Sequence, residues 1–192
     1  MNKIPTIIFG GSFDPVHVGH LALASEACNR GLASEVWFML SPLNPHKVGR
    51  KISAEDVRLR MLQLAVAGDA RFKASSFELS LPRPSYTVNT LMALEEAFPN
   101  REFILLIGAD NWEKFDKWYK WETILSRYKI VVYPRGDEEK PTLPAGVEWL
   151  AAELYDVSST MVRGAVATGG DISRMVPPAV AQFIKENNLY KE

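Results

Sequence analysis

The sequence predicts an α/β fold built on a doubly wound parallel sheet, with helices on both faces and a small helical C-terminal part. Short runs of β-branched and aromatic residues alternate with longer segments of helical periodicity, which is the order that parallel βαβ units require. A chain of 192 residues is about the size of one domain and is long enough to bury a substantial core. We therefore expect residues 1–192 to form a single domain.

Six apolar runs, bounded by residues that favour turns, are expected to be the strands of this sheet. In chain order they are Pro5–Phe9, Glu35–Leu40, Phe72–Leu79, Glu102–Ile107, Lys129–Tyr133 and Val147–Ala151. The charged and proline-containing segment 134–144 is expected to be a loop within the domain, because the strand pattern resumes after it.

Helices are expected between these strands. The first runs from Val18 to Arg30 and stops at Gly31, and the second begins with a capping box formed by Ser53 and Asp56. The remaining helical segments are expected after Tyr86, beyond Asp110, near Glu122–Tyr128, from Ser158 and from Pro178.

Composition excludes several classes of protein. Hydrophobic residues make up 47% and charged residues 23% of the chain, which is unlike a disordered or collagen-like sequence. The formal net charge is −1, so the surface as a whole is not basic enough to attract a polyanion, and we expect no nucleic-acid partner. The single cysteine, Cys28, suits a reducing compartment, and no apolar run is long enough to cross a bilayer. We expect a cytoplasmic protein with no membrane partner.

The most informative segment is GGSFDPVHVGH, from Gly10 to His20, which joins the first strand to the first helix. Open α/β folds bind ligands at this edge of the sheet. Gly10 and Gly11 allow close approach of the backbone, and the N–H groups of the following helix favour an anion. The pattern is neither the dinucleotide-binding GxGxxG nor the P-loop GxxxxGK[ST]. It predicts a phosphate-binding turn of another kind.

His17 and His20 are three residues apart and can lie on one side of the helix start. Two imidazolium cations are unfavourable at a helix N-terminus unless an anion is bound. The residues alone leave three interpretations open: neutral structural histidines, zinc ligands with His46 as a third, and phosphate ligands.

Two further clusters are suited to phosphate. SPLNPHK follows the second strand and can supply Lys47 as a mobile cation, although a solvated loop lysine is the alternative. In VSSTMVR, the hydroxyl groups of Ser158, Ser159 and Thr160 precede Arg163, and a plain N-cap explains only one of these hydroxyls.

Other segments are suited to a flat, sugar-bearing ligand. Asp110, in IGADNW after the fourth strand, can accept hydrogen bonds from ribose hydroxyls or, as an N-cap, from helix N–H groups. Four aromatic residues, any of which can stack on a planar ring or belong to the core, crowd into ten positions: Trp112, Trp118, Tyr119 and Trp121.

These motifs carry a family resemblance. GGSFDPVHVGH resembles the GxFxPxHxGH signature of the nucleotidyltransferase α/β-phosphodiesterase superfamily, and VSSTMVR resembles its C-terminal ISSTxIR signature. SPLNPHK, FELSLPRPSYTVNTL, LIGADNW and WYKWETI are similar to the bacterial nicotinate-mononucleotide adenylyltransferase family, and the similarity spans nearly the whole chain. One departure is that Ser80 and Leu81 follow Glu78-Leu79 where relatives often have basic residues, with Arg83 displaced.

The resemblance implies a Rossmann-like nucleotidyltransferase domain that transfers AMP from ATP to nicotinate mononucleotide, giving nicotinate adenine dinucleotide and pyrophosphate in NAD biosynthesis. Mg²⁺ is expected on the phosphates, because no carboxylate cluster suggests a metal site of the protein's own. Because the substrate phosphate itself attacks the α-phosphorus, no protein nucleophile is needed. Two alternatives are another nucleotidyltransferase of the superfamily, such as one acting on phosphopantetheine, and a nucleotide sensor without turnover.

The resemblance also assigns roles to residues. It makes His17 and His20 catalytic. Around ATP it places Gly10, Gly11, Ser12, Phe13, His17, His20, Lys47, Ser158, Thr160 and Arg163. Around nicotinate mononucleotide it places Asn44, Tyr86, Thr87, Asp110, Trp118, Tyr119 and Arg135.

Overall fold

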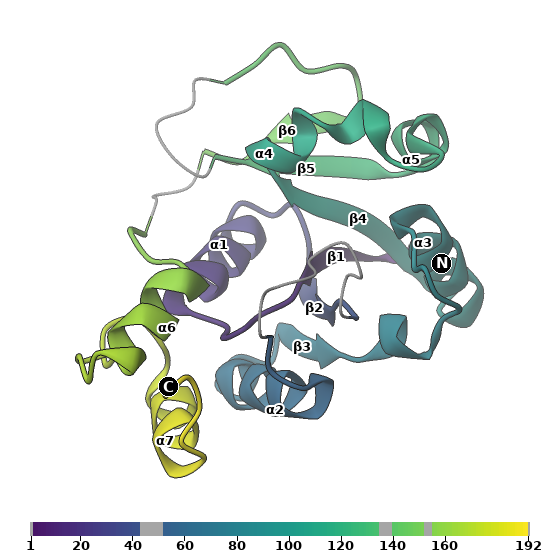
Figure 1. Ribbon diagram of the computed structural model, residues 1–192. Coiled ribbons are helices and arrows are strands. Elements are labelled where there is room, and N and C mark those ends of the chain that lie inside the picture. The colour runs from purple at the N-terminus through teal and green to yellow at the C-terminus, as the bar shows by residue number, and fades with distance from the viewer. Residues whose placement is uncertain (1, 43–51, 135–139, 152–154, 192) are drawn as a thin grey trace.

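The fold is a parallel sheet covered by helices on both faces, as a computed structural model shows for residues 2–42, 52–134, 140–151 and 155–191 (Figure 1). Among these residues six strands pair, all in parallel, in the order β3-β2-β1-β4-β5-β6. This is the strand order of the doubly wound dinucleotide-binding fold, whose direction of winding reverses between β1 and β4. The predicted fold class is confirmed. The strands are β1 (Ile4–Gly11), β2 (Glu35–Leu40), β3 (Phe72–Ser75), β4 (Arg101–Gly108), β5 (Lys129–Tyr133) and β6 (Val147–Trp149).

Two groups of helices lie on opposite faces of the sheet (Figure 1). One face is covered by α1 (Val18–Asn29), α2 (Glu55–Val66), α6 (Ser159–Ala167) and α7 (Pro178–Glu186). The other is covered by α3 (Thr87–Ala97), the short α4 (Ala109–Trp112) and α5 (Trp121–Arg127), with the 3₁₀ turns η2 (Phe77–Ser80) and η3 (Phe115–Lys117). None of the helices in the described ranges has the length and apolar character needed to cross a bilayer.

The central strand β1 contributes to both cores. Ile7 and Phe9 pack on the side of α1 and α2, whereas Ile8 packs on the side of α3, and all three side chains are buried. A strand covered on both faces reads as a continuous apolar run, which is why Pro5–Phe9 could be recognised in the sequence. Because helices cover both faces of the sheet, a ligand can reach it only at the ends of the strands.

The third strand is shorter than predicted. It ends at Ser75, and the chain then forms η2 instead of continuing as a strand to Leu79. Hydroxyl groups account for the change, because Ser75 Oγ accepts a hydrogen bond from the N–H of Phe77 and Ser80 Oγ donates to the Phe77 carbonyl. At the far edge, β6 ends at Trp149, two residues before the predicted end.

The predicted capping box at α2 is wrong. Ala54 is the N-cap of α2, and no side chain caps this helix. The N–H of Ser53 instead donates to Asp14 Oδ2, and the Ser53 carbonyl accepts from Arg58 Nε. Tertiary partners thus replace the local hydrogen bonds that the S-x-x-D spacing suggested.

Candidate active site

The turn between β1 and α1 has two glycines with different surroundings. A Cβ at Gly11 would lie 3.0 Å from the ring of Phe13, so the turn requires glycine there. Phe13 adopts a φ of 45°, is 2% exposed, and packs edge-on against Phe9 and Phe38. Gly10 has open space beside it and lines the pocket described below. Gly11 therefore makes room for the turn, whereas Gly10 presents backbone to the pocket.

The two histidines lie together at the start of α1, as their spacing predicted. Their rings stack with centroids 3.6 Å apart, and His17, the N-cap residue, is 8% exposed. The main-chain N–H of His17 donates to Nδ1 of His20 over 3.2 Å, so a neutral His20 carries its proton on Nε2. A Cβ at Gly19 would lie 3.1 Å from the His17 ring. Gly19, to which the sequence analysis gave no role of its own, therefore leaves room for the His17 ring and for Val157.

The N-terminal part of α6 holds the β1–α1 turn from a second side. Ser158 caps α6 by accepting a hydrogen bond from the N–H of Met161, and Ser159 Oγ donates to the Pro15 carbonyl over 2.8 Å. Arg163 donates from Nη1 to the Asp14 carbonyl over 2.6 Å and from Nη2 to Thr160 Oγ1 over 3.2 Å. The two signature segments, which are far apart in the sequence, therefore form one hydrogen-bonded unit.

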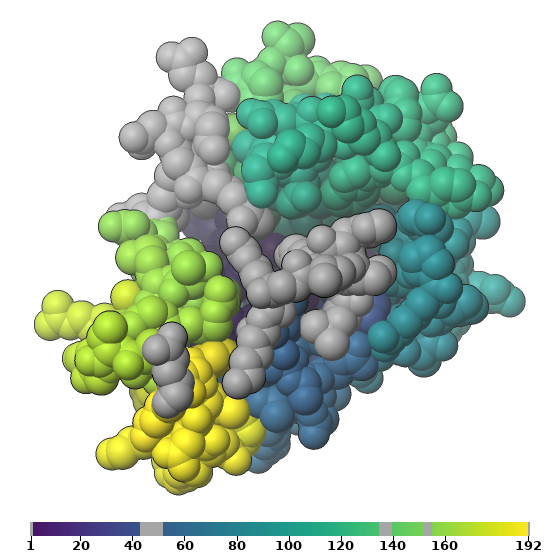
Figure 2. Space-filling view, viewed as in Figure 1, coloured from purple at the N-terminus to yellow at the C-terminus, as the bar shows by residue number. Residues whose placement is uncertain are grey.

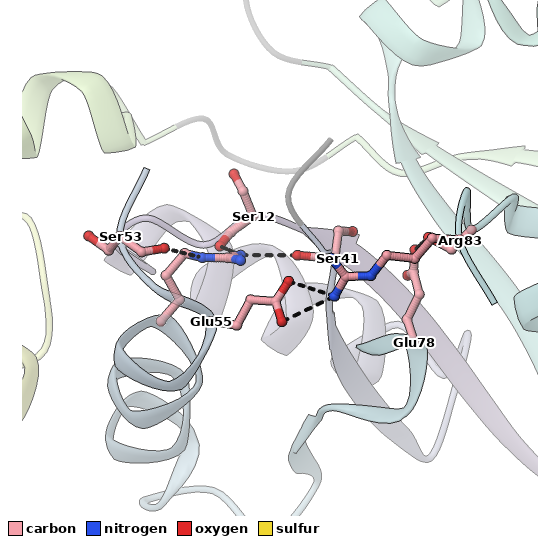
Figure 3. Close-up of polar contacts among 8 residues, drawn as sticks. Ser12, Ser41, Ser53, Glu55, Glu78 and Arg83 are labelled. Atoms are coloured by element: carbon pink, nitrogen blue, oxygen red, sulfur yellow. Dashed lines mark hydrogen bonds and ion pairs between the residues drawn. The ribbon is translucent and has the colours of Figure 1, made fainter. Parts of the chain in front are cut away.

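Arg58 on α2 also holds the β1–α1 turn, through the main-chain carbonyl of Ser12. This side chain is fully buried in α2 and donates to three main-chain carbonyls, those of Ser12, Ser41 and Ser53, over 2.8, 3.0 and 2.9 Å (Figure 3). Burial lowers the pKa of Arg58 from its usual value. Because Ser12 follows β1 and Ser41 follows β2, one guanidinium ties together the two loops at the sheet edge. Nothing in the sequence motifs had singled out Arg58.

A pocket opens at the carboxyl ends of the central strands. It has a volume of about 170 Å³, and in the space-filling view the N-terminal residues, in purple, lie recessed between the yellow-green C-terminal part and the teal middle of the chain (Figure 2). Its polar or glycine lining is formed by Gly10, Ser41, Glu78, Thr87, Thr90, Gly108, Asn111 and Tyr133. The location is the one expected for a ligand of a doubly wound sheet.

Glu78 places a partly buried carboxyl group in the wall of this pocket. Burial raises the pKa of Glu78, and a 2.7 Å hydrogen bond from Ser85 Oγ only partly offsets that effect. Arg83, the displaced basic residue, pairs instead with Glu55 on α2 over 3.0 Å (Figure 3). The structure thus brings Glu78, Ser41 and Asn111 to the pocket although sequence reasoning gave them no role. Their positions just beyond strand ends were the signal available for Ser41 and Asn111.

The crowded aromatic residues divide between core and site. Trp112 and Trp121 pack on the buried Phe115 ring, and Trp118 packs on the same ring while also lining the pocket. Tyr119 is 48% exposed and packs against Tyr86, with ring centroids 4.6 Å apart and the ring planes tilted by 36°. Of the three tryptophans, Trp118 is the one that borders the pocket.

The remaining predicted residues have different outcomes. Asp110 is exposed within α4, whose N-cap is Gly108, so its interpretation as an N-cap is wrong, and it is not part of the pocket lining. Asn44, His46, Lys47 and Arg135 lie outside the described residues. In the described part of the chain, no group of three or more His, Cys, Asp or Glu side chains could hold a metal ion.

Comparison with known proteins defines the class and then the family. The cytidylyltransferase-like family matches residues 8–165, which places the chain in that class of nucleotidyltransferase. A protein of Bacteroides fragilis named probable nicotinate-nucleotide adenylyltransferase is 47% identical over 186 residues, covering 96% of this chain and 92% of that protein. One of the same name from Bacteroides thetaiotaomicron is 44% identical over 187 residues, covering 96% and 93%. The chain belongs to the nicotinate-nucleotide adenylyltransferase family.

A solved structure supports the fold. Plasmodium falciparum nicotinic acid mononucleotide adenylyltransferase, complexed with NaAD, superposes with a TM-score of 0.79 and 17% sequence identity, covering 98% of each chain. At this identity the likeness concerns the fold, which is Rossmann-like in both proteins.

Proposed function

We propose that this chain transfers the AMP moiety of ATP to nicotinate mononucleotide, giving nicotinate adenine dinucleotide and pyrophosphate in NAD biosynthesis. The observation that carries the proposal is the direct joining of the two signature segments, through Ser159 and Arg163, beside a pocket at the carboxyl edge of the sheet. Two relatives, 47% and 44% identical to this chain over 186 and 187 aligned residues, are named probable nicotinate-nucleotide adenylyltransferase, which supports the proposal.

The reaction needs positioning and charge stabilisation more than a protein nucleophile. The phosphate of the mononucleotide attacks the α-phosphorus of ATP in line, and pyrophosphate leaves. His20 donates from Nε2 to the α-phosphoryl group as negative charge develops, because its Nδ1 already accepts from His17. His17 holds a neighbouring phosphate oxygen at the N-terminus of α1, where the helix dipole favours an anion.

The other ATP residues act around this pair. Gly10, Gly11 and Ser12 contribute backbone, and Phe13 contributes from the core by shaping the turn. Ser158, Thr160 and Arg163 steady the triphosphate or the departing pyrophosphate. Lys47, outside the described residues, is assigned to the same phosphates.

Nicotinate mononucleotide is assigned to the pocket. Trp118 borders it and offers a face on which the pyridine ring stacks, and the hydroxyl of Thr87 reaches the ring carboxylate. We assign Tyr86 and Tyr119, whose rings pack against each other at a tilt, to the same ligand. Asp110, Asn44 and Arg135 complete the proposed set, the last two lying outside the described residues.

Membership of a nucleotidyltransferase family suggests the use of a divalent cation, and we propose Mg²⁺. Mg²⁺ usually keeps several waters and binds through substrate phosphates with few protein ligands, so it requires no carboxylate cluster. When bound, it neutralises phosphate charge. We also propose that residues 1–192 act as one domain in the cytoplasm, a location that the single cysteine favours.

The test is a pyrophosphate-release assay with ATP and one acceptor at a time: nicotinate mononucleotide, phosphopantetheine, or none. Release only with nicotinate mononucleotide, abolished by a chelator and restored by Mg²⁺, is the expected result. Release with phosphopantetheine instead would identify a different transferase of the class. ATP binding without release for either acceptor would identify a nucleotide sensor.

A further inference from the structure

Tyr190, in the segment that follows α7, reaches back to the β1–α1 turn. Its hydroxyl donates to Asp14 Oδ1 over 2.6 Å, across 176 positions of sequence. Asp14 is 3% exposed, and its other carboxylate oxygen accepts from the N–H of Ser53 over 3.2 Å. The main-chain carbonyl of Asp14 accepts from Arg163. Asp14 is therefore the point at which the segment before α2, α6 and the segment after α7 all contact the turn.

The chain turns sharply between α7 and Tyr190. Asn188 ends α7 in a Schellman motif, in which the N–H of Leu189 donates to the Ile184 carbonyl and the N–H of Asn188 to the Lys185 carbonyl. Asn188 and Tyr190 have φ values of 49° and 61°, in the left-handed region that a bulky side chain such as tyrosine rarely adopts. Beyond this turn the Tyr190 hydroxyl reaches α2, where it lies 3.9 Å from Met61 Sδ. Burial and the neighbouring Asp14 raise the pKa of the Tyr190 hydroxyl, so it remains a protonated donor at neutral pH.

The turn held in this way carries the catalytic histidines. Asp14 lies two residues after Ser12, whose carbonyl Arg58 holds, and three residues before His17. A change in the position of Asp14 must therefore alter the path of the chain into α1. An enzyme that works by positioning is sensitive to displacements of this kind.

We propose that Tyr190 is a positioning residue for ATP, acting through Asp14 on the turn that leads to His17 and His20. The inference rests on the proposed function for its substrate. It predicts that loss of the Tyr190 hydroxyl weakens the use of ATP and leaves the affinity for nicotinate mononucleotide unchanged, because the pocket lining described above does not include Asp14 or Tyr190.

A second tyrosine provides a matched control. The hydroxyl of Tyr128 donates to Glu95 Oε2 over 2.7 Å, and Tyr128 is 5% exposed. It belongs to the core on the α3 and α5 side of the sheet, away from the β1–α1 turn. Tyr128→Phe and Tyr190→Phe therefore each remove one phenol donor from a carboxylate, but only the second loss occurs at the turn.

The experiment measures kcat and both KM values for the wild type, Tyr190→Phe and Tyr128→Phe. For Tyr190→Phe we expect KM for ATP to rise and kcat/KM for ATP to fall by about three- to tenfold, the usual effect of one hydrogen bond. KM for nicotinate mononucleotide should not change, and Tyr128→Phe should change neither KM. A merely structural role would lower the folded fraction, and so kcat, without altering the KM for ATP.

Hydrogen exchange supplies a readout that is independent of activity. Amides of residues 12–20 should exchange faster in Tyr190→Phe than in the wild type or in Tyr128→Phe, even if the wild type proves to use another acceptor. If Tyr190→Phe does not fold, Asp14→Asn tests the same contact. It replaces the carboxylate that accepts from the Tyr190 hydroxyl and the Ser53 N–H by an amide, which is a weaker acceptor on one side and a donor on the other. This variant should also raise the KM for ATP. Unchanged exchange together with an unchanged KM for ATP would overturn the proposal.

Discussion

At the scale of single residues, one main-chain hydrogen bond sets the chemistry of His20. The N–H of His17 donates to Nδ1 of His20, so a neutral His20 carries its proton on Nε2, the atom that we propose donates to a phosphate of ATP. A donor aimed at charge that develops in the transition state contributes chiefly there.

We predict that His20→Ala lowers kcat by about 10²- to 10³-fold, as for other donors to a developing oxyanion, with a much smaller loss of ATP affinity. Steady-state kinetics give the first quantity, and calorimetric titration with ATP in the absence of acceptor gives the second. Near-normal turnover would return His20 to the structural interpretation, in which the stacked rings only pack the helix start.

The raised pKa of Glu78 predicts how the stability of the protein changes with pH. Burial raises the pKa of Glu78 above its ordinary value of 4.5, so the folded protein binds this proton more tightly than the unfolded chain does. The free energy of unfolding should therefore fall as pH rises from 4.5 through the raised pKa of the folded state. Glu78→Gln keeps an acceptor for Ser85 and carries no charge, so it should be more stable than the wild type at pH 7 and less pH-dependent.

Urea unfolding at several pH values between 4 and 8 tests this prediction, with Glu148→Gln as the control in which an exposed glutamate loses the same charge. A Glu78→Gln protein that is less stable at neutral pH would show that the carboxylate has a stabilising partner.

At the scale of elements, α2 stabilises the two loops that follow β1 and β2, because its Arg58 side chain donates hydrogen bonds to their main-chain carbonyls. Arg58→Ala would leave the carbonyls of Ser12, Ser41 and Ser53 without their donor and would open a cavity, so we predict a loss of about 3 kcal/mol or more in the free energy of unfolding. Arg60→Ala, on the exposed side of the same helix, should change stability by about 0.5 kcal/mol or less. Denaturant titration of both variants measures the difference, and equal losses would refute the role given to Arg58.

The start of α6 is the other supporting element. Arg163 already holds the Asp14 carbonyl and Thr160, and its cationic group is assigned to the phosphates. Arg163→Ala should lower kcat/KM for ATP by about tenfold to a hundredfold, the range for hydrogen bonds to a charged group, and change the affinity for nicotinate mononucleotide little. Arg163→Lys should restore only part of this, because lysine lacks the planar fork. Separate titrations of the two substrates decide the question, and equal losses for both would assign Arg163 to the fold alone.

At the scale of the whole molecule, both halves of the sheet contribute to the pocket that we assign to nicotinate mononucleotide. β1 supplies Gly10, and the segments after β2, β3 and β4 supply Ser41, Thr87 and Trp118, respectively. A carboxylate only accepts hydrogen bonds, so a donor such as the Thr87 hydroxyl suits nicotinate better than nicotinamide, whose N–H₂ would face a donor.

We therefore predict that the acid mononucleotide exceeds the amide by about tenfold to a hundredfold in kcat/KM, the effect of one opposed polar group. Thr87→Val should reduce this preference, whereas Trp118→Ala should weaken both substrates through lost stacking. Measuring kcat/KM for both mononucleotides on the three proteins tests the prediction, and equal use by the wild type would contradict it.

Much of the fold could be read from the sequence, because it depends on short-range patterns. Apolar runs such as Glu35–Leu40 and Lys129–Tyr133 coincide with the observed strands, since a strand buried on both faces must be apolar along its length. Likewise, the spacing of His17 and His20 and the helix expected from Ser158 are local features, and the structure has both: the histidines lie together at the start of α1, and α6 begins directly after its N-cap, Ser158.

Only the tertiary structure decided which distant groups meet. The capping box at Ser53 failed because Asp14 and Arg58 offered its main-chain groups other partners, and β3 ended early because serine hydroxyls replaced its ladder. The hydrogen bond from Tyr190 to Asp14 joins opposite ends of the described chain. The sequence by itself determined the order of the elements, the signature turn and the family, because periodicity and motif spacing act over a few residues. The partners of buried polar groups are selected by packing over the whole molecule, and no local pattern records them.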